Sequence, residues 1–346
     1  MCESFRPTFT DIKKYAVFLL LGSISAYLSI SFSKDWIHYQ WFFNVIYAET
    51  TWIELLKNNI PFSEPLFFVT AKVLDELIGL ANFVVITTVI LFTLKMHFLT
   101  KLVDNVFAVT FMYVCLYLFL FEGTLLRVAY ATAFIIPAMY YLQKEKLFLS
   151  ILLFLIATQI QLTSIIFIIM YPLFLYGRLN WLVIALFIIA PMTILLDLSA
   201  FNLIVDLTKL FSNKYQFYSD EKIIDSQNST GLFYYFIGFY YVLVIAIGCY
   251  LRQQIMSDSF KKMIFSLAML GCVSMCFFYD HVAVGARLGE LLLISMVILL
   301  GWLYIYFKEK QLPLHNYALI FIFMAYGLAR FFYLYPTLVS QLKALV

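Results

Sequence analysis

Charged residues are scarce in this sequence. Only 12% of its 346 residues are Asp, Glu, Lys or Arg, whereas 64% are hydrophobic and 19% are aromatic, and the mean hydropathy is +0.93. A soluble domain carries about 25% charged and about 45–50% apolar residues. This composition excludes a water-soluble protein. The formal net charge of +3 implies little about partners, because in a membrane protein the side on which charges lie matters more than their sum. No nucleic-acid partner is expected.

Paired cysteines and the short motifs of soluble enzymes are also missing. None of the five cysteines shares a paired spacing in a loop, and Cys272 and Cys276 lie in an apolar run, where packing is the favoured interpretation. There is no glycine-rich phosphate loop, HExxH, CxxC or GxSxG motif. We therefore expect no nucleotide-binding domain, no metal site and no cofactor. No small-residue cleavage site follows the long first apolar run, so no cleavable signal peptide is expected.

Long apolar runs are what the sequence has in abundance. Runs of roughly 17–21 residues match the thickness of a bilayer. They predict an all-α polytopic integral membrane protein, with one transmembrane domain over 1–346 and about eleven spans. The expected spans are 15–33, 78–94, 104–121, 125–142, 147–159, 162–176, 181–198, 231–250, 263–279, 287–307 and 316–335.

The distribution of Lys and Arg predicts the orientation. With the N-terminus in the cytoplasm, every short inside loop is basic, as cytoplasmic loops usually are. The C-terminus then lies outside. The expected cytoplasmic basic residues are Arg6, Lys13, Lys14, Lys95, Lys101, Lys144, Lys146, Arg178, Arg252, Lys261, Lys262, Lys308 and Lys310.

Three segments need a separate interpretation. The polar centre TQIQLTS of 147–176 predicts two short helices rather than one long one, and broken helices are tolerated where they are buried or line a cavity. Segment 34–77 alternates aromatic and acidic residues at helical spacing, which predicts an amphipathic helix at the outer membrane interface. Segment 199–230 is polar and long enough to be an outer-face lid.

Arginines stand where the orientation gives no reason for positive charge. Arg127, Arg287 and Arg330 are all expected at the outer side, and charges within spans usually face a cavity or a partner. Arg287 could pair with Glu290 at i, i+3, and Arg330 suits the C-terminal end of its helix. Arginine binds phosphate oxygens bidentately, so Arg127 and Arg287, from separate helices, would make a diphosphate clamp, and Arg330 is a further candidate for binding the diphosphate. Further outer-face candidates are Glu122, Asp280, Glu290 and Gln161.

A candidate proton acceptor follows the first span. On a helix, Asp35, His38 and Tyr39 share one face, and a carboxylate or imidazole there could accept a proton from an attacking hydroxyl. The simpler alternative is an interfacial helix whose polar face meets water. Two further catalytic candidates are Glu64 and His281. Glu64 precedes a proline that is expected to begin a new helix.

The order of these elements resembles the EpsG-type branch of the Wzy-like polysaccharide polymerases. Such proteins are similar in having an acid and a tyrosine after the first span, here Asp35 and Tyr39 in KDWIHY, and a glutamate in a turn before the second, here Glu64 in SEPLF. An arginine opens a mid-chain helix, here Arg127 in LLRVAYATAF, and another opens a late helix, here Arg287 in GARLGELLLI.

The polar break departs from the pattern. Similar sequences often carry a histidine where QIQLTS has Gln161, so the resemblance implies no general base at that position. The base is expected at Asp35, His38 or His281 instead.

The resemblance implies a GT-C-like or Wzy-like helical bundle in the bacterial cytoplasmic membrane. Oligosaccharide repeat units carried on undecaprenyl diphosphate would be joined at its outer face into an O-antigen, capsule or exopolysaccharide. This chemistry needs a cation clamp, a base and a groove open to lipid. The implied partners are the lipid-linked substrate, membrane lipid, and a chain-length regulator and flippase of the same pathway.

Three other functions compete with polymerisation. A flippase or transporter of the same lipid commonly has duplicated halves, and no internal repeat is found here. An O-antigen ligase uses the same donor with a different acceptor. A membrane acyltransferase would need a catalytic histidine at a cytoplasmic or midplane position, but neither His97 nor His315 has an adjacent acid.

Overall fold

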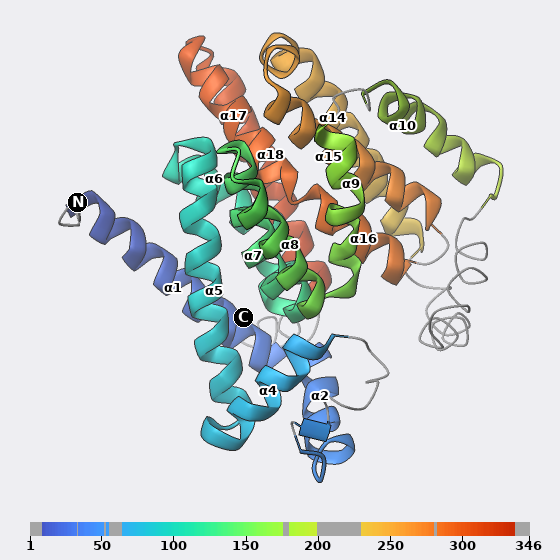
Figure 1. Cartoon of the computed structure of the whole chain (residues 1–346). Coiled ribbons are helices and arrows are strands. Elements are labelled where there is room, and N and C mark those ends of the chain that lie inside the picture. The colour runs from blue at the N-terminus through green and yellow to red at the C-terminus, as the bar shows by residue number, and fades with distance from the viewer. Residues whose placement is uncertain are drawn as a thin grey trace, which may run out of the picture. The chain divides into compact units, whose positions relative to one another are not determined.

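Helices form nearly all of the chain that the structure describes (Figure 1). The computed structural model describes residues 9–32, 34–51, 53–54, 64–175, 180–198, 230–279 and 282–335, and these include no strand. The helices are α1 (Phe9–Phe32), α2 (Lys34–Trp41), η1 (Phe42–Ile46), α4 (Pro65–Ile78), α5 (Leu80–Val103), α6 (Val106–Tyr113), η2 (Val114–Glu122), α7 (Leu126–Gln143), α8 (Leu147–Ile160), η3 (Leu162–Ser164), α9 (Ile165–Leu175), α10 (Asn180–Leu195), α14 (Thr230–Ser257), α15 (Ser259–Phe277), α16 (Val282–Leu293), α17 (Ser295–Glu309) and α18 (Pro313–Leu334).

Local sequence explains where several of these helices begin. Pro65 occupies the first turn of α4, where its missing N–H costs nothing. The Asn105 side chain accepts a hydrogen bond from the Ala108 N–H at 2.9 Å and caps α6. Asp258 caps α15 in the same way by accepting from two N–H groups of the first turn.

The chain divides into two compact units. Unit 1 comprises 1–59, 64–162 and 307–346, and unit 2 comprises 60–63 and 163–306. Within unit 1, α5 packs against α1, α4, α6 and α7, while α8 lies beside α7 and also contacts α4 (Figure 1). Within unit 2, α15 packs against α10, α14 and α16. The expectation of a single transmembrane domain over 1–346 stays a prediction.

Helices α15 and α16 approach each other closely because glycines face each other between them. A Cβ atom on Gly271 would lie 3.0 Å from the Gly289 carbonyl oxygen, and one on Gly289 would lie 3.1 Å from the Gly271 carbonyl oxygen. Small residues allow such close backbone approach between membrane helices, where van der Waals packing is a main source of association.

Six helical stretches in the described residues are long and apolar enough to cross a membrane: Asp11–Ser31, Leu80–Val103, Phe233–Ser257, Ser259–Phe277, Val284–Glu309 and Pro313–Leu334. Shorter apolar helices cover Val106–Glu122, Leu147–Ile160, Leu162–Tyr171 and Trp181–Leu195. The chain is thus a multi-pass helical membrane protein. Each range predicted as a span overlaps a helix, but the number of eleven stays a prediction.

Several helices extend beyond the predicted spans, and one of these differences bears on the candidate residues. The span expected to end at residue 94 continues as α5 to Val103, so Lys95 lies within a helix and not in a loop. The prediction placed the end of the span at the lysine because a charged side chain usually marks the end of an apolar helix. A lysine that has a partner inside the protein can instead lie within the helix.

The predicted break near residue 161 is confirmed. Helix α8 ends at Ile160, Gln161 has an extended backbone, and a short 3₁₀ turn precedes α9. Segment 34–77 is helical over α2 and α4, and its aromatic residues Trp36 and Phe43 are 8% and 2% exposed. The expected lid at 199–230 lies outside the described residues except for Thr230, where α14 begins.

Candidate functional site

Glu64 is the centre of the candidate site. It precedes the first residue of α4, and its side chain is fully buried. One carboxylate oxygen forms an ion pair with Nη1 of Arg127, and the other accepts a hydrogen bond from the Leu162 N–H at 2.9 Å. Burying a carboxylate is costly unless it is paired, and here each oxygen has a donor.

The helix break at Gln161 supplies the second donor. Gln161 ends α8 with φ −141° and ψ 111°, so the chain leaves the helical path before Leu162. The Leu162 N–H is then available for the Glu64 carboxylate instead of an intrahelical carbonyl. Since α8 contacts both α4 and α7, three distant segments of the sequence meet at one point within unit 1.

Arg127 is only partly enclosed. It is the second residue of α7, and 19% of its side chain is exposed. Its guanidinium carbon lies 5.9 Å from the centroid of the Phe68 ring, a distance at which a cation is attracted to the ring face. The positive end of the α7 dipole lies in the same place, so this end of the helix favours an anion.

Tyr47 packs beside these residues. Its ring centroid is 5.8 Å from that of Phe68, it is 5% exposed, and its hydroxyl has no hydrogen-bond partner among the described residues. Burial raises the pKa of the phenol above its usual value, although the nearby charge of Arg127 acts in the opposite direction. The phenol therefore stays protonated at neutral pH and can donate a hydrogen bond.

The structure does not support a common face for His38 and Tyr39. His38 is exposed, whereas Tyr39 is 5% exposed and its ring centroid lies 5.5 Å from that of Phe67. Neighbouring helix residues are separated by about 100°, and the packing of α2 buries only one of this pair. Asp35 lies in α2, but its side chain, like Asp280 and His281, lies outside what the structure describes.

Glu122 belongs to a buried polar network instead of an open outer mouth. It forms an ion pair with Lys95, and the two side chains are 2% and 1% exposed. Tyr113 completes the network, because its hydroxyl accepts from the Lys95 amine at 2.8 Å and donates to Glu122 at 2.8–2.9 Å. Because these two groups touch, Lys95 in a cytoplasmic loop and Glu122 at an outer span end cannot both be right.

Arg330 supports the backbone of η2. It is 5% exposed, and its Nη1 donates to the Leu116 carbonyl at 2.8 Å and to the Tyr326 hydroxyl at 3.1 Å. These contacts favour a structural role. Its assignment as a diphosphate ligand stays a prediction.

The other outer-face candidates lie in different surroundings. Gln161 is 7% exposed in unit 1. In unit 2, Glu290 is 3% exposed and accepts a hydrogen bond from the Tyr240 hydroxyl at 3.1 Å, and Arg287 is half-buried on α16. Arg127 belongs to unit 1 and Arg287 to unit 2. The two-arginine clamp therefore stays a prediction.

Sequence reasoning missed Tyr47, Phe68 and the partner of Glu122. No local signal marks Tyr47 and Phe68, because both stand among other aromatics. Lys95 carried a usable signal, since a lysine inside the apolar run LFTLKMHFL indicates a buried partner.

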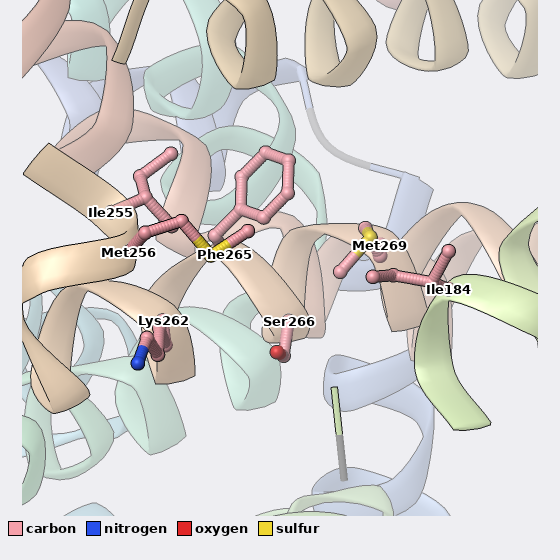
Figure 2. Close-up of a pocket in the computed structure, with 7 residues that line it drawn as sticks. All are labelled: Ile184, Ile255, Met256, Lys262, Phe265, Ser266 and Met269. Atoms are coloured by element: carbon pink, nitrogen blue, oxygen red, sulfur yellow. The ribbon is translucent and has the colours of Figure 1, made fainter. Parts of the chain in front are cut away.

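A pocket in unit 2 gives no alternative site of comparable chemistry. Figure 2 shows the side chains that line it, of which Lys262 and Ser266 are polar and the others are apolar. Its volume of about 30 Å³ has room for a water molecule rather than a sugar. Within the described ranges, no group of three or more His, Cys, Asp or Glu side chains could hold a metal ion.

These features define a multi-pass helical membrane protein with an acid–arginine site enclosed between helices. The EpsG family model matches residues 13–342, nearly the whole chain, so the chain belongs to the EpsG family. No curated protein and no solved structure matches it. The EpsG family is associated with polysaccharide biosynthesis, and the chain is a polysaccharide polymerase-like membrane protein.

Proposed function

We propose that this protein is a glycosyltransferase that joins oligosaccharide repeat units carried on undecaprenyl diphosphate. The reaction takes place at the outer face of the bacterial cytoplasmic membrane, and undecaprenyl diphosphate is the leaving group. Membership of the EpsG family supports the polysaccharide class. The lipid carrier, the membrane and the orientation are parts of the proposal.

The contact between Glu64, Arg127 and the Leu162 N–H carries this proposal. These groups are separated by 63 and 98 residues along the chain, yet they meet at one carboxylate. A bundle stabilised only by apolar packing has no need of a buried carboxylate, because replacing buried ion pairs with hydrophobic residues is often neutral or stabilising. The arrangement is accounted for if Glu64 holds the Arg127 guanidinium in the orientation that an anionic substrate requires.

Each group then has a distinct task in the reaction. The acceptor hydroxyl oxygen attacks the anomeric carbon of the donor sugar, and the bond between that carbon and the diphosphate oxygen breaks. Arg127 stabilises the negative charge that develops on the leaving diphosphate. Glu64 positions Arg127 and is not the base, since both its oxygens already accept hydrogen bonds. Asp35, His38 or His281 takes the proton of the acceptor hydroxyl, and Arg287 is the second arginine of the clamp.

Substitution of Arg127 in a complementation assay tests the proposal. Lysine keeps the charge but loses the planar fork, so both Arg127→Lys and Arg127→Ala should shorten the surface polysaccharide at normal membrane levels. Losing the contact would raise the barrier by about 2–4 kcal/mol, or roughly 30- to 1000-fold in rate. Arg252→Ala is the matched control, because Arg252 is an exposed arginine on α14.

Gel electrophoresis of the surface polysaccharide from a strain that lacks the protein separates the rival functions. Loss of a polymerase leaves single capped repeat units, loss of a ligase leaves undelivered lipid-linked polymer, and loss of a flippase leaves neither at the surface. Full-length polymer from an Arg127→Ala variant that accumulates normally would overturn the proposal.

A further inference from the structure

Tyr47 carries a buried hydroxyl that the fold does not use. The residue follows η1, and its backbone N–H donates to the Phe42 carbonyl at 2.8 Å. Its ring packs against Phe43 and Phe68 at centroid distances of 5.9 and 5.8 Å. Packing therefore explains the ring, but the hydroxyl is closed from solvent and has no hydrogen-bond partner within the described part of the chain.

An unsatisfied buried hydroxyl lowers stability, so phenylalanine would suit this position better if packing were its only task. Most buried polar groups in proteins have a partner, and each exception needs an explanation. A hydrogen-bond acceptor on a bound ligand would supply one.

The position of Tyr47 indicates the charge of that ligand. Phe68 contacts both Tyr47 and Arg127, since its ring centroid is 5.8 Å from that of Tyr47 and 5.9 Å from the guanidinium carbon. A guanidinium has five N–H donors, so one edge can hold Glu64 while another meets an anion. The Tyr47 phenol packs on the same Phe68 ring and feels the charge of Arg127, so its hydroxyl adds a further donor, and phosphate oxygens are acceptors that suit both groups.

We propose that the Tyr47 hydroxyl and the Arg127 guanidinium together bind a phosphate group of a phosphorylated lipid. Tyr47 donates a hydrogen bond to one phosphate oxygen, and Arg127 contacts the others. The proposal rests on the proposed function for the identity of the lipid, which is then the diphosphate carrier. The headgroup of an ordinary phospholipid offers the same chemistry, and the experiment distinguishes the two sources.

The burial of the hydroxyl also predicts how binding proceeds. Arg127 is 19% exposed, whereas the Tyr47 hydroxyl is enclosed, so the phosphate meets the guanidinium first. Contacts that are buried in the complex act mainly on the dissociation rate. Tyr47 should therefore slow release of the lipid with little effect on its capture.

The test uses the full chain in phosphatidylcholine nanodiscs, with undecaprenyl diphosphate as the probe. Tyr47→Phe removes only the hydroxyl and should weaken binding about tenfold, which corresponds to about 1.4 kcal/mol. Its midpoint of thermal unfolding should stay the same or rise, because the orphan hydroxyl is gone. Arg127→Ala should weaken binding as well.

Tyr335→Phe is the matched control. Tyr335 is 1% exposed, but its hydroxyl donates to the Phe119 carbonyl at 3.0 Å. This variant should lose thermal stability and bind the probe normally, the reverse of Tyr47→Phe.

The possible outcomes are distinct. Unchanged binding by Tyr47→Phe together with weak binding by Arg127→Ala overturns the role of Tyr47 and leaves the proposed function standing. If the wild-type protein does not bind undecaprenyl diphosphate, both proposals fail. If phosphatidylglycerol displaces the probe at equal concentration and both variants weaken the two lipids alike, the phosphate site stands, but its ligand is an ordinary headgroup and the proposed donor loses this support.

Discussion

At the scale of single residues, the candidate site depends on how donors and acceptors balance around one carboxylate. Glu64 has a donor for each of its oxygens, whereas the Tyr47 hydroxyl has none among the described residues. A satisfied group stabilises the fold and an unsatisfied one does not. The two residues should therefore respond to substitution in opposite directions.

The first prediction concerns Glu64→Gln. The amide keeps the size of the side chain and can still accept from the Leu162 N–H, but it removes the charge that faces Arg127. We expect a stability loss of about 1–3 kcal/mol, measured as a lower midpoint of thermal unfolding in detergent, together with reduced polymer. Glu49→Gln is the control, because Glu49 is exposed. Normal polymer from a Glu64→Gln variant that accumulates normally would contradict the positioning role of the carboxylate.

At the scale of elements, the π-helix η2 is joined to its surroundings by several polar contacts. Its wide turns displace carbonyls from the regular α-helical pattern, and π-helices are frequent at functional sites. Arg330 and Tyr335 donate to the carbonyls of Leu116 and Phe119. Glu122 ends η2 and pairs with Lys95, and α7 with Arg127 begins a few residues later. These contacts fix the start of α7.

The second prediction concerns the buried pair of Lys95 and Glu122. Lys95→Met alone leaves the buried Glu122 carboxylate without its cation, and Glu122→Gln alone leaves the buried Lys95 ammonium without its anion. Each single variant should lower the free energy of unfolding by about 3–5 kcal/mol. The double variant should recover much of that loss, because neither charge then remains. Glu76→Gln is the control, because Glu76 is 50% exposed in its ion pair with Lys72. This substitution should lower the free energy of unfolding by less than about 1 kcal/mol. A double variant as unstable as the sum of the singles would show that the two residues act independently.

The third prediction concerns the packing of α18 on η2. A Cβ on Gly327 would lie 3.0 Å from Cys115 Cα and 3.2 Å from its carbonyl oxygen, and backbone atoms cannot move aside as a flexible side chain can. Gly327→Ala should therefore lower the unfolding midpoint. Gly238→Ala is the matched control, since its Cβ meets nothing within 4 Å, and alanine should stabilise α14 by up to about 1 kcal/mol. Equal stability of the two variants would argue against tight contact between α18 and η2.

At the scale of the whole molecule, the chain comprises two units and crosses the membrane several times. The candidate site with Glu64 and Arg127 lies in unit 1, and the second arginine of the proposed clamp lies in unit 2. The orientation of the spans decides whether these groups face the compartment where lipid-linked sugars are joined.

The fourth prediction is the orientation itself. The Lys and Arg distribution places segment 199–230 and the C-terminus outside and the Arg252–Lys262 region in the cytoplasm. In a background without the native cysteines, Ser219→Cys should react with an impermeant maleimide added from outside, and Ser257→Cys should react only after the membrane is opened. Labelling of both positions from one side would contradict the orientation and with it the outer-face location of the reaction.

Much of the fold could be predicted from the sequence, because bilayer thickness and local capping act on neighbouring residues. Apolar runs of spanning length specify helices, Pro65 marks the start of α4, and the polar residues around Gln161 interrupt a helix that would otherwise continue. The same patterns indicated Glu64 and Arg127 one by one as residues that the membrane does not explain.

Only the tertiary structure decided which of these residues meet. Glu64 and Arg127 are 63 residues apart, and no spacing rule connects a turn before α4 with the start of α7. The same holds for Lys95 and Glu122, which the charge pattern had placed on opposite sides, and for Tyr47, whose contact with Phe68 joins two distant positions of the sequence. Hydrogen bonds and ion pairs act over a few ångströms in space, so their partners are fixed by helix packing and not by position along the chain.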